Sequence, residues 1–338
     1  MQQIWFPKAG PPSVLQLRSA DDPTPDPGEV RVAVEAAGVN FADVMARMGL
    51  YPDAPPFPMV VGYEVAGTVD ALGEGVPESW LGAPVVAMTR FGGYSTKVCL
   101  PIGQVSRRPD GLDATTAAAI PVTGLTAWML LMEFGRVREG DRVLVHSASG
   151  GVGLMVLDIA KHHGAYVAGT ASGHKHEALY ARGFDKLIDY RNEDFFTALS
   201  GEPPFDLVLD PVGGASWTKG LDLLRAGGKL VCYGMSSNAK SSQRSVFAVL
   251  RNLLAVPWLR INPINLMHEN KSVCGVNMGR MWHESERVTG WLDELLALWS
   301  EGVLRPQVHA TVPFSDAAAA HQIIHDRANV GKVVLVPD

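Results

Sequence analysis

Hydrophobic and polar residues alternate in short stretches along the first third of the chain. The stretch Glu29–Val39 has the period of two that is typical of a half-buried β-strand, and Glu64–Leu72 and Gly93–Leu100 are similar. A short helical run, Phe41–Met48, interrupts these strands and precedes a Pro-rich loop at Tyr51–Pro58. Because Gly and Pro punctuate the region densely, we expect a folded-over β-barrel with many turns.

From Thr123 onward the pattern changes, and apolar strand-like runs alternate with helix-like runs. A helical run at Thr126–Phe134 comes first. The alternating segments that follow are Arg142–His146, Gly150–His163, Ala165–Thr170, His174–Ala181, Lys186–Asp189, Asp194–Leu199, Asp206–Asp210, Ala215–Leu224 and Lys229–Gly234. Such alternation predicts βαβ units and a parallel sheet, in which Ser272–Val276 is the expected last strand.

The C-terminal part starts with an amphipathic helix, Glu284–Trp299, whose apolar stripe we expect to pack in a core. This stripe comprises Val288, Trp291, Leu292, Leu295, Leu296 and Trp299. The segments His309–Phe314, Ser315–Asp326 and Lys332–Val336 then predict a strand, a helix and a strand. We expect this end of the chain to complete the first domain, which gives one domain at 1–121 with 278–338 and another at 122–277.

Composition and charge narrow the class of protein. Of the 338 residues, 47% are hydrophobic, and the formal net charge of −6 argues against nucleic acid as the main partner. The three cysteines are far apart in sequence, which fits the reducing cytoplasm. The N-terminal sequence lacks the pattern of a signal peptide. We also expect no apolar stretch long enough to cross a bilayer, since the nearest candidate, Val246–Leu259, is interrupted by polar residues and Pro.

A glycine-rich turn follows the first strand of the alternating region, in the sequence VLVHSASGGVG at Val143–Gly153. Ala148, Gly150 and Gly153 occupy the A-x-G-x-x-G frame of dinucleotide-binding turns. Small residues there permit a tight turn, close approach of backbone to a pyrophosphate, and close packing of helix on strand. The following helix N-terminus favours phosphate. An ordinary βα turn is the alternative, but the strand–turn–helix context favours dinucleotide binding.

The end of the second strand in this region indicates which dinucleotide binds. No carboxylate that could bind ribose hydroxyls follows Val167–Ser172. Instead, Ser172 and Lys175 offer a hydroxyl and a cation, which suit a 2′-phosphate, and Tyr190 after the third strand is a further candidate. A helix cap at Ser172 with a solvated Lys175 is the alternative. The sequence favours NADP over NAD.

With these residues in place, the chain resembles the medium-chain dehydrogenase/reductase superfamily and, within it, the zinc-independent NADPH:quinone reductase group. The resemblance rests on AAGVNFADVMARMGLYP, PFPMVVGYEVAGTV, IPVTGLTAWMLL, GDRVLVHSASGGVG, VLDPVGG, GGKLVCYG and GKVVLV. Two further segments, IDYRNEDF and LMHENKSVCGVNMG, are similar to the branch of synaptic-vesicle amine-transport protein homologues. The resemblance implies an α/β protein with a GroES-like β-barrel catalytic domain, a Rossmann doubly wound parallel sheet and a cleft between them. It also implies a homodimer paired through Ser272–Val276.

The resemblance assigns NADPH-binding roles to thirteen residues. They are Ala148, Gly150, Gly151, Val152 and Gly153 around the pyrophosphate, Ser172, Lys175, Tyr190 and Arg327 at the adenosine phosphate, and Thr123, Tyr233, Gly234 and Asn277 toward the nicotinamide.

The positions of the zinc ligands in related dehydrogenases hold other residues in this chain. Zinc-dependent relatives place Cys in a G-I-C motif and His in a G-H-E motif, where this chain has Asn40 and Tyr63, with Glu64 retained. Neither replacement is a usual zinc ligand. Only Cys99 lies in the first half of the chain, so the Cys-rich structural-zinc lobe is missing as well. We therefore expect no zinc.

Without a Lewis acid to activate an alcohol, we expect quinones or α,β-unsaturated carbonyls to accept hydride from NADPH. The candidate substrate residues are Asn40, an amide donor, Tyr51, a ring that could stack on the acceptor, and Tyr63, a hydroxyl donor. Packing explains a buried Tyr63 equally well. Asp43, one helical turn after Asn40, is expected to orient local structure, with helix stabilisation as the alternative.

A second function stays open beside the reductase. It is an NADPH-binding protein with little turnover that acts through a partner or a lipid surface. The segment Asn238–Asn270 begins polar and turns apolar, so it fits structural packing, a hydrophobic substrate entrance or peripheral membrane contact.

Overall fold

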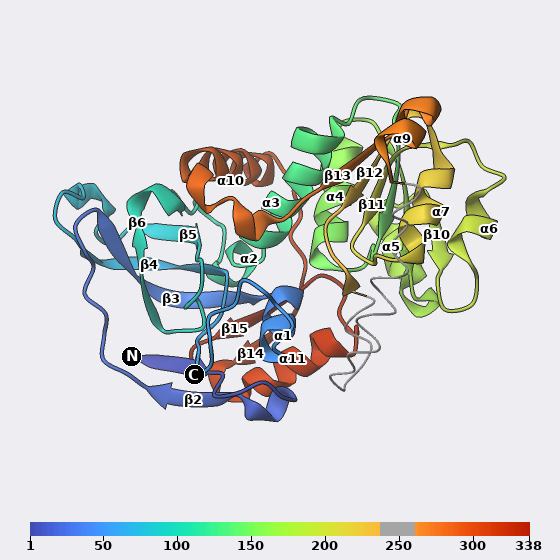
Figure 1. Ribbon diagram of the computed structural model, residues 1–338. Helices are drawn as coiled ribbons and strands as arrows, with labels where there is room; N and C mark the ends of the chain where they lie inside the picture. Colours follow the sequence, from blue (N-terminus) through green and yellow to red (C-terminus); the bar gives the residue numbers. More distant parts are fainter. Residues whose placement is uncertain (237–260) are drawn as a thin grey trace. The chain divides into compact units, whose positions relative to one another are not determined.

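The computed structural model describes residues 1–236 and 261–338, and its backbone divides into two compact units (Figure 1). The first unit comprises Met1–Leu125 and Met278–Asp338, and the second comprises Thr126–Asn277. The chain therefore builds most of the first unit, forms the second, and returns to finish the first.

A seven-stranded sheet is the centre of the first unit, with the order β14-β15-β3-β4-β5-β7 and with β6 paired to β3. Its strands are β3 (Glu29–Val39), β4 (Glu64–Leu72), β5 (Pro84–Met88), β6 (Lys97–Pro101), β7 (Val105–Arg107), β14 (Val308–Pro313) and β15 (Lys332–Val336). In the antiparallel pair of β15 and β3, Val334 lies opposite Gly38. The C-terminal strand thus completes a sheet that begins near the N-terminus, as the hydrophobic pattern predicts.

The predicted strand at Gly93–Leu100 is wrong in its first half, because β6 begins only at Lys97. The residues before it bond elsewhere. The Tyr94 amide donates to the Val61 carbonyl, and the Tyr94 carbonyl accepts from Ile4 in β1 (Gln2–Trp5), which forms a separate two-stranded sheet with β2 (Gln16–Ser19). The aromatic ring of Tyr94 is fully buried in the core of this unit.

Helices cover this sheet and its ends. They are α1 (Phe41–Arg47), α2 (Ala114–Ala117), α10 (Ser285–Ser300) and α11 (Ala317–His325), together with the first half of α3 (Pro121–Trp128). The stripe on α10 is buried as expected, except that Trp299 is only partly buried. Helix α10 lies beside the segment that joins β6 to β7, where the Thr289 hydroxyl donates to the Gly103 carbonyl at 2.6 Å.

The second unit contains a six-stranded parallel sheet in the order β10-β9-β8-β11-β12-β13. Its strands are β8 (Arg142–His146), β9 (Tyr166–Ala171), β10 (Lys186–Asp189), β11 (Phe205–Asp210), β12 (Leu224–Cys232) and β13 (Ser272–Gly275). Its helices are α4 (Gly151–His162), α5 (His176–Arg182), α6 (Phe195–Leu199), α7 (Ala215–Leu223) and α9 (Pro263–Glu269). The strand order reverses direction between β8 and β11, which is the Rossmann arrangement and the place where such sheets bind ligands.

One helical stretch, Ala114–Gly135, is 22 residues long and apolar enough to cross a membrane, so the expectation that no stretch has that length and composition is wrong. However, 72% of its apolar window is buried inside the protein, as in a core helix. It combines α2 and α3 with a π-helical turn at Met129–Gly135, so the predicted helix at Thr126–Phe134 begins earlier than expected.

Most of the segment Asn238–Asn270 lies outside the described residues, and the three interpretations of it stay untested. Its described end contains α9, on which Ile264 and Met267 are exposed.

Candidate functional site

The glycine-rich turn joins β8 to α4 at the point where the strand order reverses. A Cβ added at Gly153 would lie 2.5 Å from the Ala148 carbonyl oxygen, so only glycine lets α4 lie this close to the turn. At Gly150, the N-cap of α4, an added Cβ would meet only the Ser147 carbonyl oxygen, at 3.3 Å. The backbone at Gly150 is therefore open to a ligand, and the N–H groups of Gly151 and Val152, in the first turn of α4, lie beside this open position. This geometry fits a pyrophosphate.

Ser172 and Lys175, which follow β9, lie beside this turn together with Tyr190, which follows β10. The Ser172 hydroxyl donates to the Tyr190 hydroxyl at 3.2 Å, and the Lys175 ammonium donates to the Ser149 hydroxyl at 3.3 Å. Ser172 and Lys175 are buried. Burial lowers the pKa of Lys175, because the ammonium loses hydration. An arriving phosphate would restore favourable charge interactions to this cation, so the cluster fits the 2′-phosphate of NADP.

Asp189, at the end of β10, is a residue that the sequence reasoning missed. Its carboxylate accepts from the Arg191 amide at 3.1 Å and from the Asn192 side chain at 2.7 Å. A Cβ on Gly173 would lie 2.5 Å from the same carboxylate. Hydrogen bonds, led by the one from the Arg191 amide, lower the pKa of Asp189. Asp189 thus holds the loops after β9 and β10 together and positions the neighbouring Tyr190.

Asp210, also missed from sequence, organises the loop after β11. Its buried carboxylate accepts from the Val212 amide at 2.6 Å and from the Ser216 hydroxyl at 2.5 Å. Its carbonyl accepts from the amide of Tyr233, which follows β12. Burial raises the pKa of Tyr233. At Gly234, an added Cβ would lie 3.0 Å from the Pro211 carbonyl oxygen, so the two loops run close together.

Three other residues that the sequence assigns to the nicotinamide or adenosine end of NADPH differ in burial and in position. Asn277 is exposed, after β13. Thr123, in the first unit, is buried and donates its hydroxyl to the Ala119 carbonyl at 2.6 Å, which leaves its oxygen available as an acceptor. Arg327 follows α11 with a left-handed backbone at φ 56°. Their contacts with cofactor stay predictions.

Asn40 belongs to a buried network around Glu64 in the first unit. Its amide nitrogen donates to Glu64 at 2.7 Å, and its amide oxygen accepts from the Lys332 ammonium at 2.6 Å. Glu64 also accepts from the Val122 amide at 2.7 Å and forms an ion pair with Lys332. The backbone amide of Asn40 donates to Asp43 at 2.7 Å, which is the contact of a helix cap, so it fits both the orienting role and the helix-stabilising role considered for Asp43. Contact between Asn40 and substrate stays a prediction.

The groups around Glu64 do not fit a zinc ion. The positive charge beside this carboxylate is the Lys332 ammonium, and Asn40 and Tyr63 contribute an amide and a phenol, which are not usual zinc ligands. Within residues 1–236 and 261–338, no group of three or more His, Cys, Asp or Glu side chains could hold a metal ion.

Tyr51 and Tyr63 lie together on a cavity of about 130 Å³ in the first unit, whose other walls include Phe91, Trp282 and Arg90. The rings of Tyr51 and Tyr63 pack edge to face with 6.0 Å between their centroids, and the ring centroid of Phe91 lies 5.3 Å from that of Tyr63. Tyr63 is 5% exposed. Among the described residues its hydroxyl makes no hydrogen bond of ordinary geometry, and the Tyr51 hydroxyl is its polar neighbour. Burial raises the pKa of Tyr63, and the nearby Asp43 raises it further. Tyr63 therefore keeps its proton and can donate a hydrogen bond to a ligand.

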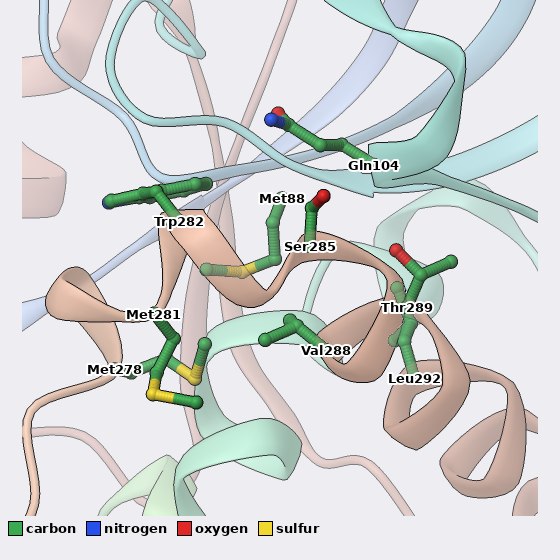
Figure 2. A pocket seen from close by; sticks show the side chains of 9 residues that line it. All are labelled: Met88, Gln104, Met278, Met281, Trp282, Ser285, Val288, Thr289 and Leu292. Carbon is green, nitrogen blue, oxygen red and sulfur yellow. The ribbon is translucent and has the colours of Figure 1, made fainter.

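A second cavity also has Trp282 in its wall (Figure 2). Met88, Met278 and Met281 line it with Trp282, opposite α10 residues such as Leu292. Its volume is about 10 Å³, which is about that of a single water probe and too small for a ring. Of these two cavities, only the one around Tyr63 can receive a planar ligand.

Comparison with known proteins agrees with this arrangement. Family models match at residues 26–124, as an alcohol dehydrogenase GroES-like domain, and at residues 182–335, as a zinc-binding dehydrogenase. The chain is 38% identical to human synaptic vesicle membrane protein VAT-1 homolog, over 96% of this chain and 82% of that protein.

Solved structures extend the comparison. Escherichia coli quinone oxidoreductase complexed with NADPH matches with a TM-score of 0.86 and 30% identity, over 100% of both chains. The human VAT-1 homolog-like protein also has a TM-score of 0.86 and 30% identity, over 100% of this chain and 98% of that chain. The enoyl reductase CurK has a TM-score of 0.84 and 26% identity, over 100% of this chain and 99% of that chain. The GroES-like and Rossmann folds are thus confirmed, and the chain belongs to the medium-chain dehydrogenase/reductase superfamily, close to the VAT-1 homologues and the quinone oxidoreductases.

Proposed function

We propose that this protein is an NADPH-dependent reductase that transfers hydride to quinones or α,β-unsaturated carbonyls without zinc. The observation that carries the cofactor assignment is the cluster of Ser172, Lys175 and Tyr190 beside the open backbone at Gly150. The similarity to a quinone oxidoreductase solved with NADPH and to an enoyl reductase supports the reaction class.

The residues of the second unit bind and orient the cofactor in this proposal. Gly150, Gly151 and Val152 accommodate the pyrophosphate at the start of α4, and the cluster around Lys175 binds the 2′-phosphate. When bound, NADPH supplies the hydride. Asp189 and Asp210 keep their loops in place through the hydrogen bonds described above.

The residues of the first unit bind the acceptor. Tyr63 donates its hydroxyl hydrogen to the acceptor's carbonyl oxygen and stabilises the negative charge that develops there. Because burial raises its pKa, Tyr63 stays protonated, and solvent supplies the final proton. Tyr51 and Phe91 pack around the planar part of the acceptor.

A second candidate function rests on the relatives' names. Several proteins that resemble this chain are called synaptic vesicle membrane proteins, which favours an NADPH-binding protein that acts at a lipid surface with little turnover. This alternative predicts sedimentation with liposomes and no reduction of any acceptor. We further propose a cytoplasmic homodimer that pairs through β13, which is the last strand of the described sheet.

Steady-state oxidation of NADPH, with NADH in parallel, tests the reductase function against a panel of quinones and enones. Saturable oxidation with NADPH preferred, by protein that contains no stoichiometric zinc, is the expected result. Tight NADPH binding with no oxidation across the panel would contradict it. Stoichiometric zinc whose removal abolishes turnover would contradict the zinc-independent mechanism.

A further inference from the structure

The cavity around Tyr63 carries positive charge that the proposed reduction does not use. Two guanidinium groups, Arg90 and Arg280, and one carboxylate, Asp53, line it. Arg280 pairs with Asp53 through contacts of 3.1 Å from Nε and 2.5 Å from Nη2. Arg90 is exposed, and no ion pair or hydrogen bond joins its side chain to a described residue. One uncompensated guanidinium therefore remains at this cavity.

The charge at this cavity is opposite in sign to that of the whole chain. The formal net charge is −6, so a cation beside an aromatic cavity is not part of a general basic surface. An arginine beside an aromatic cavity suits a carboxylate or a phosphate, because its planar donor fork matches both groups.

The size and walls of the cavity favour a single planar ring. A cavity of about 150 Å³ holds benzene, and this cavity has a volume of about 130 Å³ and a lining that mixes aromatic with charged side chains. Tyr51, Tyr63, Phe91 and Trp282 supply aromatic walls. The neighbouring methionine-lined cavity, at about 10 Å³, offers no room for a long apolar substituent without rearrangement of its side chains.

We infer, on the basis of the proposed reductase function, that the preferred acceptors are planar conjugated carbonyl compounds that carry a carboxylate or phosphate group. The ring lies among the four aromatic side chains, the carbonyl oxygen accepts from Tyr63, and the anionic group binds Arg90. Arg90 is thus a specificity-determining residue, and Asp53 reduces the affinity for anions by neutralising Arg280.

Matched acceptors test this inference on the full chain with NADPH bound. The probes are a benzylideneacetone with a para carboxylate, the methyl ester of that compound, and its para-phosphate analogue. Wild-type protein is expected to have a kcat/KM about fivefold or more higher for an anionic probe than for the ester. The ratio of kcat/KM for the carboxylate probe to kcat/KM for the phosphate probe shows which of the two anions the protein prefers.

Variants assign the preference to the proposed residues. Arg90→Gln is expected to remove the preference for the anion and to leave kcat/KM for the ester within about twofold, whereas Arg90→Lys keeps part of it. Asp53→Asn is expected to increase the preference, because Arg280 then loses its partner. Arg138→Gln removes an exposed arginine from the second unit and serves as the matched control.

Equilibrium binding of the acid and the ester, measured by isothermal titration calorimetry, separates this inference from the proposed function. Failure of both probes and of the whole quinone and enone panel to oxidise NADPH would overturn the reductase function, while tighter binding of the acid, lost in Arg90→Gln, would still support the anion site. Equal affinities for acid and ester, unchanged by Arg90→Gln, would overturn the inference even if both compounds are reduced.

Discussion

Replacing Lys332 by methionine perturbs the buried network around Glu64. Lys332 is 4% exposed and Glu64 is 0% exposed, so water cannot replace the ammonium as the partner of the carboxylate. Methionine is an unbranched apolar side chain one atom shorter than lysine, so it removes the charge and keeps most of the stem. The variant leaves Glu64 with two donors, Asn40 and the Val122 amide, and leaves the Asn40 oxygen without a partner among the described residues.

The expected loss follows from these contacts. Removing one member of a buried ion pair costs about 3–5 kcal/mol, because the other charge stays buried without compensation. The orphaned Asn40 oxygen belongs to the same network, so its cost is included in this range. In the double variant with Glu64→Gln, the Asn40 amide can turn and accept from the new side-chain amide. We therefore expect the double variant to recover about 2 kcal/mol or more of the loss.

Urea unfolding followed by circular dichroism measures the free energy of unfolding for the single and double variants. Lys8→Met, which removes an exposed lysine, is the control and should change stability by less than about 0.5 kcal/mol. A loss below about 1 kcal/mol for Lys332→Met would refute the reasoning. A double variant at least as unstable as the sum of the single variants would also refute it, since it would show no coupling between the two side chains.

Three further predictions concern the cofactor turn and a buried carboxyl group. Lys175→Met should weaken NADPH binding about tenfold or more and NADH binding less than about twofold, measured by calorimetry; equal losses would contradict the 2′-phosphate assignment. Gly150→Val should fold but bind neither NADPH nor NADH, and unchanged NADPH affinity would contradict the turn assignment. Gly153→Val should instead lose about 3 kcal/mol or more of stability, because its side chain clashes with the Ala148 backbone. Burial raises the pKa of Asp43 from 3.8 to about 7, so between these pH values the folded state keeps a proton that the unfolded state loses. The free energy of unfolding should therefore fall as pH rises from 3.8 to about 7. Unfolding of wild-type protein and Asp43→Asn at several pH values tests this, because the variant should lack this contribution.

Much of the fold is predictable because the hydrophobic pattern of each segment agrees with the burial of its side chains in the folded protein. The alternation in Glu29–Val39 and the apolar runs of the parallel strands match the burial of β3 and β8. The prediction fails where distant backbone decides the structure, as at Tyr94, whose amide and carbonyl bond to Val61 and Ile4 rather than within β6.

The candidate site is less predictable than the fold. Gly150 and Lys175 can be predicted, because the glycine-rich turn and the residues after the second strand of the parallel sheet are recognisable in the sequence. Asp189 cannot, because its carboxylate joins the loops after β9 and β10, which come together only in the folded chain. Lys332 meets Asn40 across 292 residues of sequence. Arg90 likewise has no motif of its own, and only the folded first unit shows that it lines the cavity around Tyr63.

Transfer of deuterium from NADPH labelled at nicotinamide C4 tests the central claim most directly. The full chain is incubated with each C4 epimer of the labelled cofactor and a benzylideneacetone, and mass spectrometry measures deuterium in the reduced product. The proposed function predicts one deuterium on the former β-carbon, from one epimer only. A reduced product without deuterium from either epimer, or the absence of reduced product from every quinone and enone of the panel, would contradict direct hydride transfer by this protein.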